Sequence, residues 1–185
     1  MSSSSRTCAA AGEDRFVFDP FRPTPAEGGH TGPTAGAVDR AAIDQRTDVA
    51  TFTTAPLGAD LHLAGDVAAE IFVESDRPSF DLCAVLSDVE PDGRVWNLTQ
   101  GIVRVDGRPR QQPVRVDMRA TCAVLRAGHR LRLSLSAGAF PAYAVNPGTG
   151  AHAGQAAAHE QRVTTLRIRH GGEAPSRLLL PVVPA

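Results

Sequence analysis

The sequence has few of the features that mark several classes of protein. It contains no lysine, one tryptophan, one tyrosine and no apolar run long enough to cross a bilayer. Its 19 basic residues are all arginine and are balanced by 20 acidic residues, which gives a formal net charge of -1 without a block of like charge. Proteins that bind nucleic acid or an anionic membrane surface usually carry a basic excess. We therefore expect neither nucleic acid nor a membrane as a partner.

Cysteine is also scarce, and its pattern bears on where the protein works. Cys8, Cys83 and Cys122 are an odd number at spacings that match neither a zinc knuckle nor a small disulfide framework. The N-terminal segment has no long apolar core behind a basic start, so it does not look like a secretion signal. We expect free thiols and a cytoplasmic location.

The pattern of the chain changes near residue 45. Residues 1–45 are rich in Ser, Pro, Gly and Ala, and the stretch 19–36 has too many breakers for a regular element. In residues 46–185, short segments with a period of two are separated by Gly, Pro and Asp. These segments are 46–57, 68–75, 80–89, 94–105, 113–118, 129–136, 163–170 and 177–183. The pattern predicts an extended lead-in (1–45) and one all-β domain (46–185), a sandwich or barrel of roughly eight strands, with at most a turn or two of helix in the Ala-rich patch 150–162.

Two of these segments differ in the faces that they present. Segment 129–136 alternates leucines with polar residues, as in a strand with one solvent-exposed face. Segment 80–89 is apolar on both faces and is interrupted by Asp81 and Ser87. One face carries Phe80, Leu82, Ala84 and Leu86, and the other carries Cys83, Val85 and Val89. Because a sandwich core covers only one face, we expect the second to be covered by another domain, by a second copy of the chain, or by Phe16, Phe18 and Phe21 of the lead-in.

The stretch from Asp88 to Gly93 superficially resembles the start of a calcium-binding loop. A calcium loop needs a bidentate Glu at its twelfth position, where this sequence has Thr99. Pro91 fixes φ at a turn position, and the following Asp-Gly pair suits a tight turn. We therefore predict a hairpin between two strands.

Catalytic motifs are absent from the sequence. We find no G-x-S-x-G, no H-E-x-x-H, no phosphate-binding glycine loop and no C-x-x-C. On a helix, His152 and His159 would share a face, with Glu160 beside the second, but without a third ligand a solvated loop is the better interpretation. His129 lies on the same side of its predicted strand as the alternating leucines of that segment. We therefore predict that its side chain faces inward and has a structural role. We expect no metal and no cofactor.

Several motifs, in a fixed order, resemble a known family. They are "FVFDPFRPTPAEGG", "RTDVATFTTAPL", Gly65, "FDLCAVLSDVEPDGRVWNLTQGIVR", "AGHRLRLSLSAGAFPAYAVNPGTG" and "APSRLLLPV". In this order they resemble the C-terminal domain of the CocE/NonD hydrolases, the family of the cocaine esterase and X-Pro dipeptidyl peptidase enzymes. The resemblance covers nearly the whole chain from Phe16 onward.

This resemblance implies a jelly-roll β-sandwich, galactose-binding-like, that packs against an α/β-hydrolase domain and helps to wall its substrate pocket. In that family the catalytic triad lies in the hydrolase domain, so no catalytic residue is carried over, and His30 is not the catalytic histidine. The sequence departs from the family pattern at three places. Val145 stands where an Arg is common, and Ala137-Gly138 interrupt what is a run of serines in the family. The third place is "DGRPR" (106–110), which replaces an arginine-rich strand end. If those positions meet the hydrolase domain in the family, their change would indicate a lost partner.

Two classes of function remain open. The first is an accessory, non-catalytic domain of an esterase or peptidase, with an α/β-hydrolase domain or a second copy of the chain as its partner. The alternative is a free-standing enzyme that binds a small-molecule ligand in a pocket of its own and acts as a cyclase, isomerase or lyase. Its candidate residues are His129, Asp81, Arg104, Tyr143 and Trp96. Asp81 on an apolar face must be paired, and Arg104 is the partner we expect, as a structural contact in the simpler interpretation. A carbohydrate-binding module is disfavoured because the sequence has so few aromatic residues.

Overall fold

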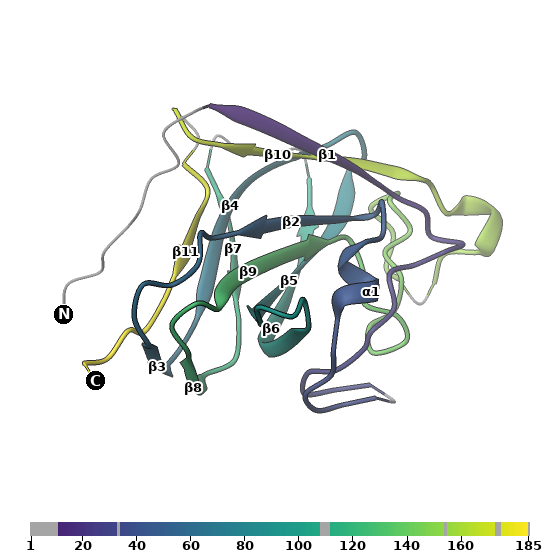
Figure 1. The fold of residues 1–185 in the computed structure, drawn as a ribbon. Helices are drawn as coiled ribbons and strands as arrows, with labels where there is room; N and C mark the ends of the chain where they lie inside the picture. Colours follow the sequence, from purple (N-terminus) through teal and green to yellow (C-terminus); the bar gives the residue numbers. More distant parts are fainter. Residues whose placement is uncertain (1–10, 33, 108–111, 154, 173–174, 185) are drawn as a thin grey trace.

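The computed structural model describes residues 11–32, 34–107, 112–153, 155–172 and 175–184, whose regular structure is almost entirely β-strand (Figure 1). The strands are β1 (Gly12–Phe18), β2 (Val49–Thr53), β3 (Leu61–Gly65), β4 (Ala68–Ser75), β5 (Ser79–Val89), β6 (Val95–Asp106), β7 (Val114–Asp117), β8 (Thr121–Leu125), β9 (Arg130–Ser136), β10 (Thr164–His170) and β11 (Arg177–Leu179). Two short helical elements accompany them, α1 (Ala41–Asp44) and the 3-10 turn η1 (Ala158–Glu160). The predicted all-β class is confirmed, and η1 is the short helical turn expected in the Ala-rich patch.

Two antiparallel sheets and a two-stranded ribbon organise these strands. The first sheet has the order β1-β10-β4-β11, with β7 also paired to β4, and the second has the order β2-β9-β5-β6. The ribbon pairs β3 with β8. Because residues of both sheets meet in one hydrophobic core, the arrangement is a sandwich.

The core forms because alternate residues of each strand point between the sheets. In β10, Leu166 and Ile168 are buried, whereas Arg167 and Arg169 are exposed. Leu135 of β9, in the opposite sheet, has no exposed surface. The period of two that predicted these strands therefore also identifies the residues of the core.

The first strand lies in the part of the chain that we expected to be an extended lead-in. β1 pairs with β10 along its whole length, from Gly12 opposite His170 to Phe18 opposite Thr164. Phe16 and Phe18 are 3% and 2% exposed and belong to the main core. The domain boundary at residue 45 stays a prediction, although a strand of the sandwich lies on its N-terminal side. β3 and β8 are two further strands that the sequence pattern did not predict.

The outer face of β9 is not exposed to solvent along its whole length, so that expectation is wrong. Ser134 and Ser136 are 2% and 7% exposed. Asp44 of α1 lies against this face and accepts hydrogen bonds from Ser134 Oγ at 2.9 Å and from Arg132 Nη1 at 3.2 Å. The cover comes from a helix of one turn, which an alternation pattern cannot reveal.

The second apolar face of β5 is covered, but not by the residues that we expected. Cys83 and Val85 pack with Ala26 of the lead-in and Ala139 of the loop after β9 in a separate buried cluster. Ile102, Ala142 and Tyr143 pack against the same cluster. The lead-in therefore contributes to this cover through a small residue. Phe16 and Phe18 lie in the main core instead, and Phe21 is 63% exposed.

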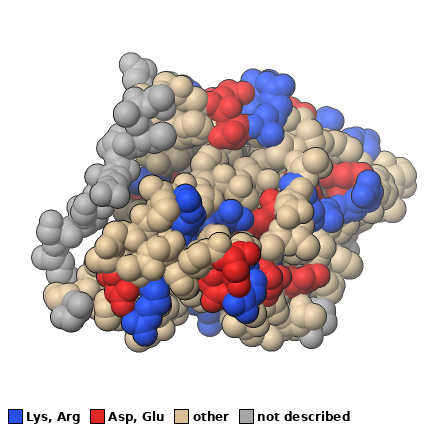
Figure 2. Space-filling model, viewed as in Figure 1, with Lys and Arg blue, Asp and Glu red and all other residues tan. Residues whose placement is uncertain are grey.

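Charged side chains of both signs are mixed on the surface. Figure 2 shows arginines and acidic residues interspersed on the face in view. Over the described surface as a whole, arginines and acidic residues form ion pairs between strands or loops, among them Arg115 with Glu70 at 3.2 Å and Arg126 with Asp60 at 2.7 Å. This face therefore offers no extended basic patch.

Candidate functional site

Asp81 and Arg104, two of the candidate residues, lie directly opposite each other on β5 and β6. Arg104 donates Nε to Asp81 Oδ1 at 2.8 Å and Nη2 to Asp81 Oδ2 at 2.7 Å. The Asp81 side chain is 3% exposed, and that of Arg104 is 35% exposed. This is a two-pronged, charge-assisted contact of the kind that fixes geometry most firmly. The expected pairing is confirmed.

A third residue completes the contacts of this carboxylate. Asn146, in the loop after β9, donates Nδ2 to Asp81 Oδ1 at 2.9 Å. Its own Oδ1 accepts hydrogen bonds from Ser79 Oγ at 3.0 Å and from the Gly148 amide at 2.9 Å. Ser79 Oγ in turn accepts the Gly150 amide at 2.9 Å. The buried polar groups thus fasten the loop 146–150 to the end of β5.

The chemistry of this network is structural. Hydrogen bonding to Asp81 raises the pKa of Arg104 above its ordinary value, which outweighs the opposite effect of burial. Both oxygens of Asp81 accept hydrogen bonds from this chain, Oδ1 from Arg104 and Asn146 and Oδ2 from Arg104. The pair anchors the loop after β9 through Ala144 and Asn146.

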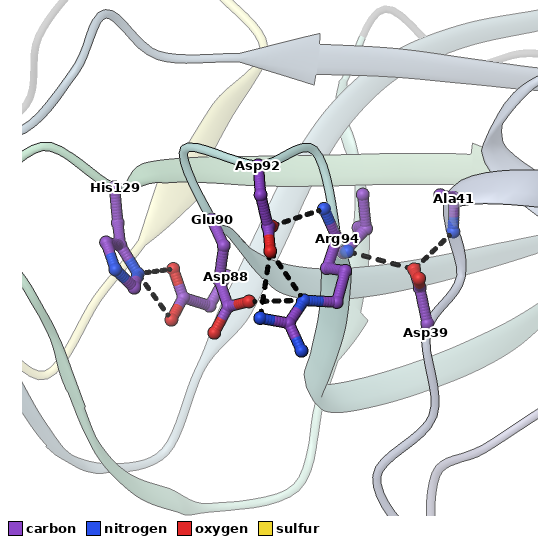
Figure 3. A network of polar contacts seen from close by, with 8 residues as sticks. Asp39, Ala41, Asp88, Glu90, Asp92, Arg94 and His129 are labelled. Carbon is purple, nitrogen blue, oxygen red and sulfur yellow. Dashed lines mark hydrogen bonds and ion pairs between the residues drawn. The ribbon is translucent and has the colours of Figure 1, made fainter.

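His129 lies at the other end of β5, just before β9. Its Nδ1 is 3.0 Å from Asp88 Oδ1 and 3.1 Å from Oδ2 (Figure 3). The two side chains are 18% and 15% exposed. A half-buried histidine held by a carboxylate fits the structural interpretation, although its ring lies at the rim of the sandwich and not in the core.

The acidic residues beside this pair belong to the predicted hairpin. The Glu90 amide donates to the Arg94 carbonyl at 2.9 Å, and the Gly93 amide donates to the Glu90 carbonyl at 3.0 Å, which closes the turn. Gly93 has a φ of +94°, a conformation that favours glycine. Arg94 forms ion pairs with Glu90 at 2.9 Å and with Asp92 at 2.8 Å (Figure 3). The hairpin is confirmed, and its carboxylates are paired within the turn.

The five candidate residues do not converge on one place. Trp96 lies opposite Asp88 on β6, with the Arg94 guanidinium 6.0 Å from its ring centroid. Asp81 and Asp88 are seven residues apart on one strand, a separation of about 23 Å. The pair at Asp81 and the pair at His129 therefore cannot act on one small substrate.

Tyr143 belongs to neither group and contacts a histidine of the lead-in. Its hydroxyl is 3.5 Å from His30 Nε2, at the limit of a hydrogen bond. Burial, and then the charge of Arg119, lower the pKa of His30. The contact helps to hold the lead-in against the outer face of β5, where Tyr143 packs beside the Cys83 cluster.

Metal and thiol chemistry find no support in the described residues. Those residues contain no group of three or more His, Cys, Asp or Glu side chains that could hold a metal ion. Burial raises the pKa of the Cys83 thiol to about 11, so this thiol is not a nucleophile at neutral pH. Cys83 and Cys122 are free cysteines, as expected, and Cys8 lies outside the described residues.

Two of the departures from the family pattern are explained by the packing of this chain. Ala137 is 1% exposed in the main core. A Cβ on Gly138 would lie 2.9 Å from the Phe18 ring, so the glycine makes room for that ring. Val145 is half-buried and packs against the same core. Residues 108–110 of the third departure lie outside the described residues.

An apolar cleft is the feature that the sequence did not predict. It lies between the two sheets, has a volume of about 570 Å³, and is lined on its inner walls by Phe52, Ile71, Leu131, Leu133, Leu135 and Ile168. Each of these residues fits an ordinary core pattern. The space between them depends on how the two sheets diverge, which no local pattern encodes.

The fold and the contacts define a β-sandwich domain whose buried polar residues hold its loops. Two histidines are paired with aspartates, His129 with Asp88 and His170 with Asp14. The family model described as the X-Pro dipeptidyl-peptidase C-terminal non-catalytic domain matches residues 4–179. The chain belongs to this family.

Known proteins agree with this assignment. The chain is 34% identical to the cocaine esterase of Rhodococcus sp. (strain MB1 Bresler) over 92% of its length and 32% of that protein. It is 25% identical to a putative serine esterase of Mycobacterium bovis over 78% of its length and 25% of that protein. Among solved structures, an alpha-amino acid ester hydrolase matches with a TM-score of 0.81 and 24% identity over 93% of this chain and 33% of the other. An aminopeptidase from a marine sediment Thaumarchaeota archaeon matches with a TM-score of 0.83 and 22% identity over 97% and 34%.

The chain thus spans about a quarter to a third of the length of the relatives that it matches. It is the non-catalytic C-terminal domain of the CocE/NonD hydrolases, as its motifs implied, and a free-standing small-molecule enzyme is not favoured. Among the described residues, no helix is long and apolar enough to cross a membrane.

Proposed function

We propose that this domain packs against an α/β-hydrolase domain and shapes the entrance to its substrate pocket. The observation that carries the proposal is the family match over residues 4–179, to a domain described as C-terminal and non-catalytic. Two relatives are named as esterases, and the chain covers only a third or less of each. The remainder of such a protein has room for the catalytic domain.

The structure of the domain fits a supporting role. Its buried polar residues hold loops, as Asp81 and Asn146 do, and its paired histidine at His129 is held by a carboxylate. A rigid sandwich with anchored loops can present a fixed surface to a neighbouring domain. We propose a cytoplasmic location as well, which the free thiols Cys83 and Cys122 support because such thiols persist in a reducing compartment.

A domain exchange tests the proposal. The region of the Rhodococcus cocaine esterase that matches this chain is replaced by this chain, and hydrolysis of 4-nitrophenyl acetate is compared with the intact esterase and with the esterase lacking that region. We expect the chimera to keep turnover with an altered KM, because a pocket wall acts chiefly on substrate binding. The chain alone should not hydrolyse the ester, because it has neither a nucleophile motif nor an oxyanion-hole motif.

Two results would contradict the proposal. One is a chimera that folds, with a cooperative melting transition, but is as inactive as the esterase lacking the region. The other is ester turnover by the chain alone that a serine-directed phosphonate abolishes. Sedimentation of the chain alone would show whether a second copy, the alternative partner, binds instead.

A further inference from the structure

The apolar cleft between the sheets has the dimensions of a small-molecule site. Its volume of about 570 Å³ lies within the range of about 300 to 1,000 Å³ that is usual for ligand pockets. Residues of β2 and β9 line it from one sheet, and residues of β1, β4, β10 and β11, Asp14 among them, line it from the other. The cleft is therefore a place where the two layers of the sandwich are incompletely closed on each other.

The inner walls of the cleft are aliphatic and elongated. Leu131, Leu133 and Leu135 follow one another on the same face of β9 and span about 13 Å. Ile71 of β4 and Ile168 of β10 line the cleft from the opposite sheet and are 2% and 1% exposed. Walls of this kind favour a hydrocarbon chain over a compact polar molecule.

Polar groups gather at the rim. Arg177 lines the cleft and donates Nε to Glu70 at 2.7 Å, while its side chain stays 52% exposed. The hydrogen bond to Glu70 uses Nε, and the exposed terminal nitrogens of the guanidinium can serve as further donors. His170 is held by Asp14 at 2.9 Å and by an edge-to-face contact with Phe52, at 5.9 Å between ring centroids.

A protein segment would fit this cleft poorly. An inserted loop would bring backbone amide and carbonyl groups between aliphatic walls, where they would lack hydrogen-bond partners. A hydrocarbon chain carries no such groups, and a single polar head could stay at the rim. The aliphatic walls and the guanidinium at the rim thus match an amphiphile with one anionic end.

We propose that the cleft binds a monocarboxylate with a hydrocarbon chain of medium length. The hydrocarbon chain lies in the cleft beside Phe52 and Leu178, with its end against Leu133, and the carboxylate accepts hydrogen bonds from the terminal nitrogens of Arg177. The residues that line the cleft all belong to this chain, so the test uses the chain alone and is separate from the domain exchange.

Calorimetric titration with decanoate and with decanol, both below the concentrations at which they aggregate, tests the two ends of the ligand. We expect decanoate to bind at one site with a negative heat-capacity change, the mark of apolar burial, and about tenfold more tightly than decanol. No saturable binding of decanoate, or equal affinity for the two compounds, would overturn the proposal.

Matched variants locate the site. Leu178 is a half-buried lining residue of β11, and Leu178→Phe adds volume at the cleft, so decanoate affinity should fall about tenfold or more. Val124→Phe, at a residue that is 43% exposed on β8 and outside the cleft, is the control and should leave affinity unchanged. If Leu178→Phe does not fold, Phe52→Trp blocks the cleft from β2. A folded blocking variant that binds decanoate as well as the unaltered chain would refute the site.

A second pair of variants tests the contact between the ligand carboxylate and Arg177. Arg177→Gln should weaken decanoate about tenfold and leave decanol within about twofold, because only the carboxylate gains from the guanidinium. Arg126→Gln, at a side chain that is 69% exposed and pairs with Asp60, should change neither affinity. Equal losses for decanoate and decanol in Arg177→Gln would place the carboxylate elsewhere and overturn the assignment.

Discussion

Asp81 shows how a polar residue on an apolar strand face is to be interpreted. The sequence predicted that it must be paired, and it has three hydrogen bonds, two from Arg104 and one from Asn146. Neither the Asn146 contact nor the loop that it fastens could be predicted, because Asn146 lies 65 residues away in the sequence. A pattern can indicate that a buried carboxylate needs donors, but only the fold identifies the donors.

Removing one member of this pair should destabilise the domain. Asp81→Asn leaves Arg104 without its counter-charge, and we expect the free energy of unfolding to fall by about 2–3 kcal/mol, below the usual range for buried pairs because Arg104 is one-third exposed. Urea unfolding of Asp81→Asn, Arg104→Gln and the double variant measures the coupling between the two residues. Asp92→Asn, at an exposed ion pair, is the control and should leave the free energy of unfolding nearly unchanged. Additive losses in the double variant would show that the contact contributes nothing.

Asp48 should make the stability of the domain depend on pH. Burial tends to raise its pKa, but hydrogen bonds from Arg46 and then Thr24 outweigh that effect, and the net result is a pKa below the ordinary value. Because the folded pKa lies below the unfolded value of about 3.9, this stabilisation is present above that value and is lost as the pH falls through the folded pKa.

Asp48→Asn tests this dependence. The variant should be less stable at neutral pH and should lose less stability between about pH 5 and pH 2 than the unaltered chain does. The free energy of unfolding measured by urea across that range is the readout. Asp66→Asn, at an exposed residue between β3 and β4, is the control. Parallel stability profiles for the unaltered chain and Asp48→Asn would contradict the prediction.

β5 is a strand whose two faces are both covered by other parts of the chain. Its inner face packs into the main core, and its outer face packs under the lead-in and the loop after β9. The sequence predicted that a strand with two apolar faces needs a second cover and named the lead-in as one candidate. It favoured the large side chains of the lead-in for this role, whereas the structure uses Ala26. The Phe140 amide and carbonyl pair with the backbone of Thr24 and Ala26 at 2.9 and 2.7 Å, which brings the segments too close together for a large ring.

Ala26→Asp should loosen this cover. Placing a carboxylate against Cys83 and Val85 leaves a charge unpaired in an apolar cluster, and we expect a loss of about 2–4 kcal/mol. In a background with Cys8→Ser and Cys122→Ser, the remaining thiol of Cys83 reports exposure directly, and Ala26→Asp should speed its modification by a thiol reagent. Phe21→Asp, at a residue that is 63% exposed, is the control and should leave the rate unchanged. If the Cys83 thiol were modified equally slowly in both variants, Ala26 would not be what covers the outer face of β5.

Elements with a clear period of two were predicted well, and the reasons for the failures are physical. β4 has the bounds that the alternation gave, and β5 differs by one residue. β1 was missed because Gly and charged residues precede its two buried phenylalanines. β3 and β8 were missed because neither alternates along its whole length: β3 (LHLAG) ends in Ala-Gly, and β8 (TCAVL) has four apolar residues in succession. The proposed cleft was out of reach because it is formed by strands of two sheets that lie far apart in sequence.

Across the whole molecule, the distribution of polar residues argues for a supporting domain. The two best-paired candidates, Asp81 and His129, hold opposite ends of β5, and their partners come from β6, from the loop after β9 and from β5 itself. Such contacts fix loops in place over the sandwich and use the groups that an acid–base centre would need. The same rigidity suits a domain that presents a constant surface to a catalytic neighbour.

Deleting residues 1–45 should unfold the domain and not merely uncover one face of it. The deletion removes β1, an edge strand paired along its full length with β10, together with Phe16 and Phe18 of the core. Burial of each ring contributes about 1.5–3 kcal/mol, and the two together approach the total stability of about 5–15 kcal/mol that is usual for a domain. We therefore expect the truncated chain to lose cooperative melting, measured by circular dichroism. Phe18→Ala alone should cost about 3–5 kcal/mol, whereas Val17→Ala, at a residue of the same strand that is 47% exposed, should cost well under 1 kcal/mol. A truncated chain that melts cooperatively at the temperature of the full chain would instead mean that residues 46–185 fold on their own, with β1 as a dispensable edge strand.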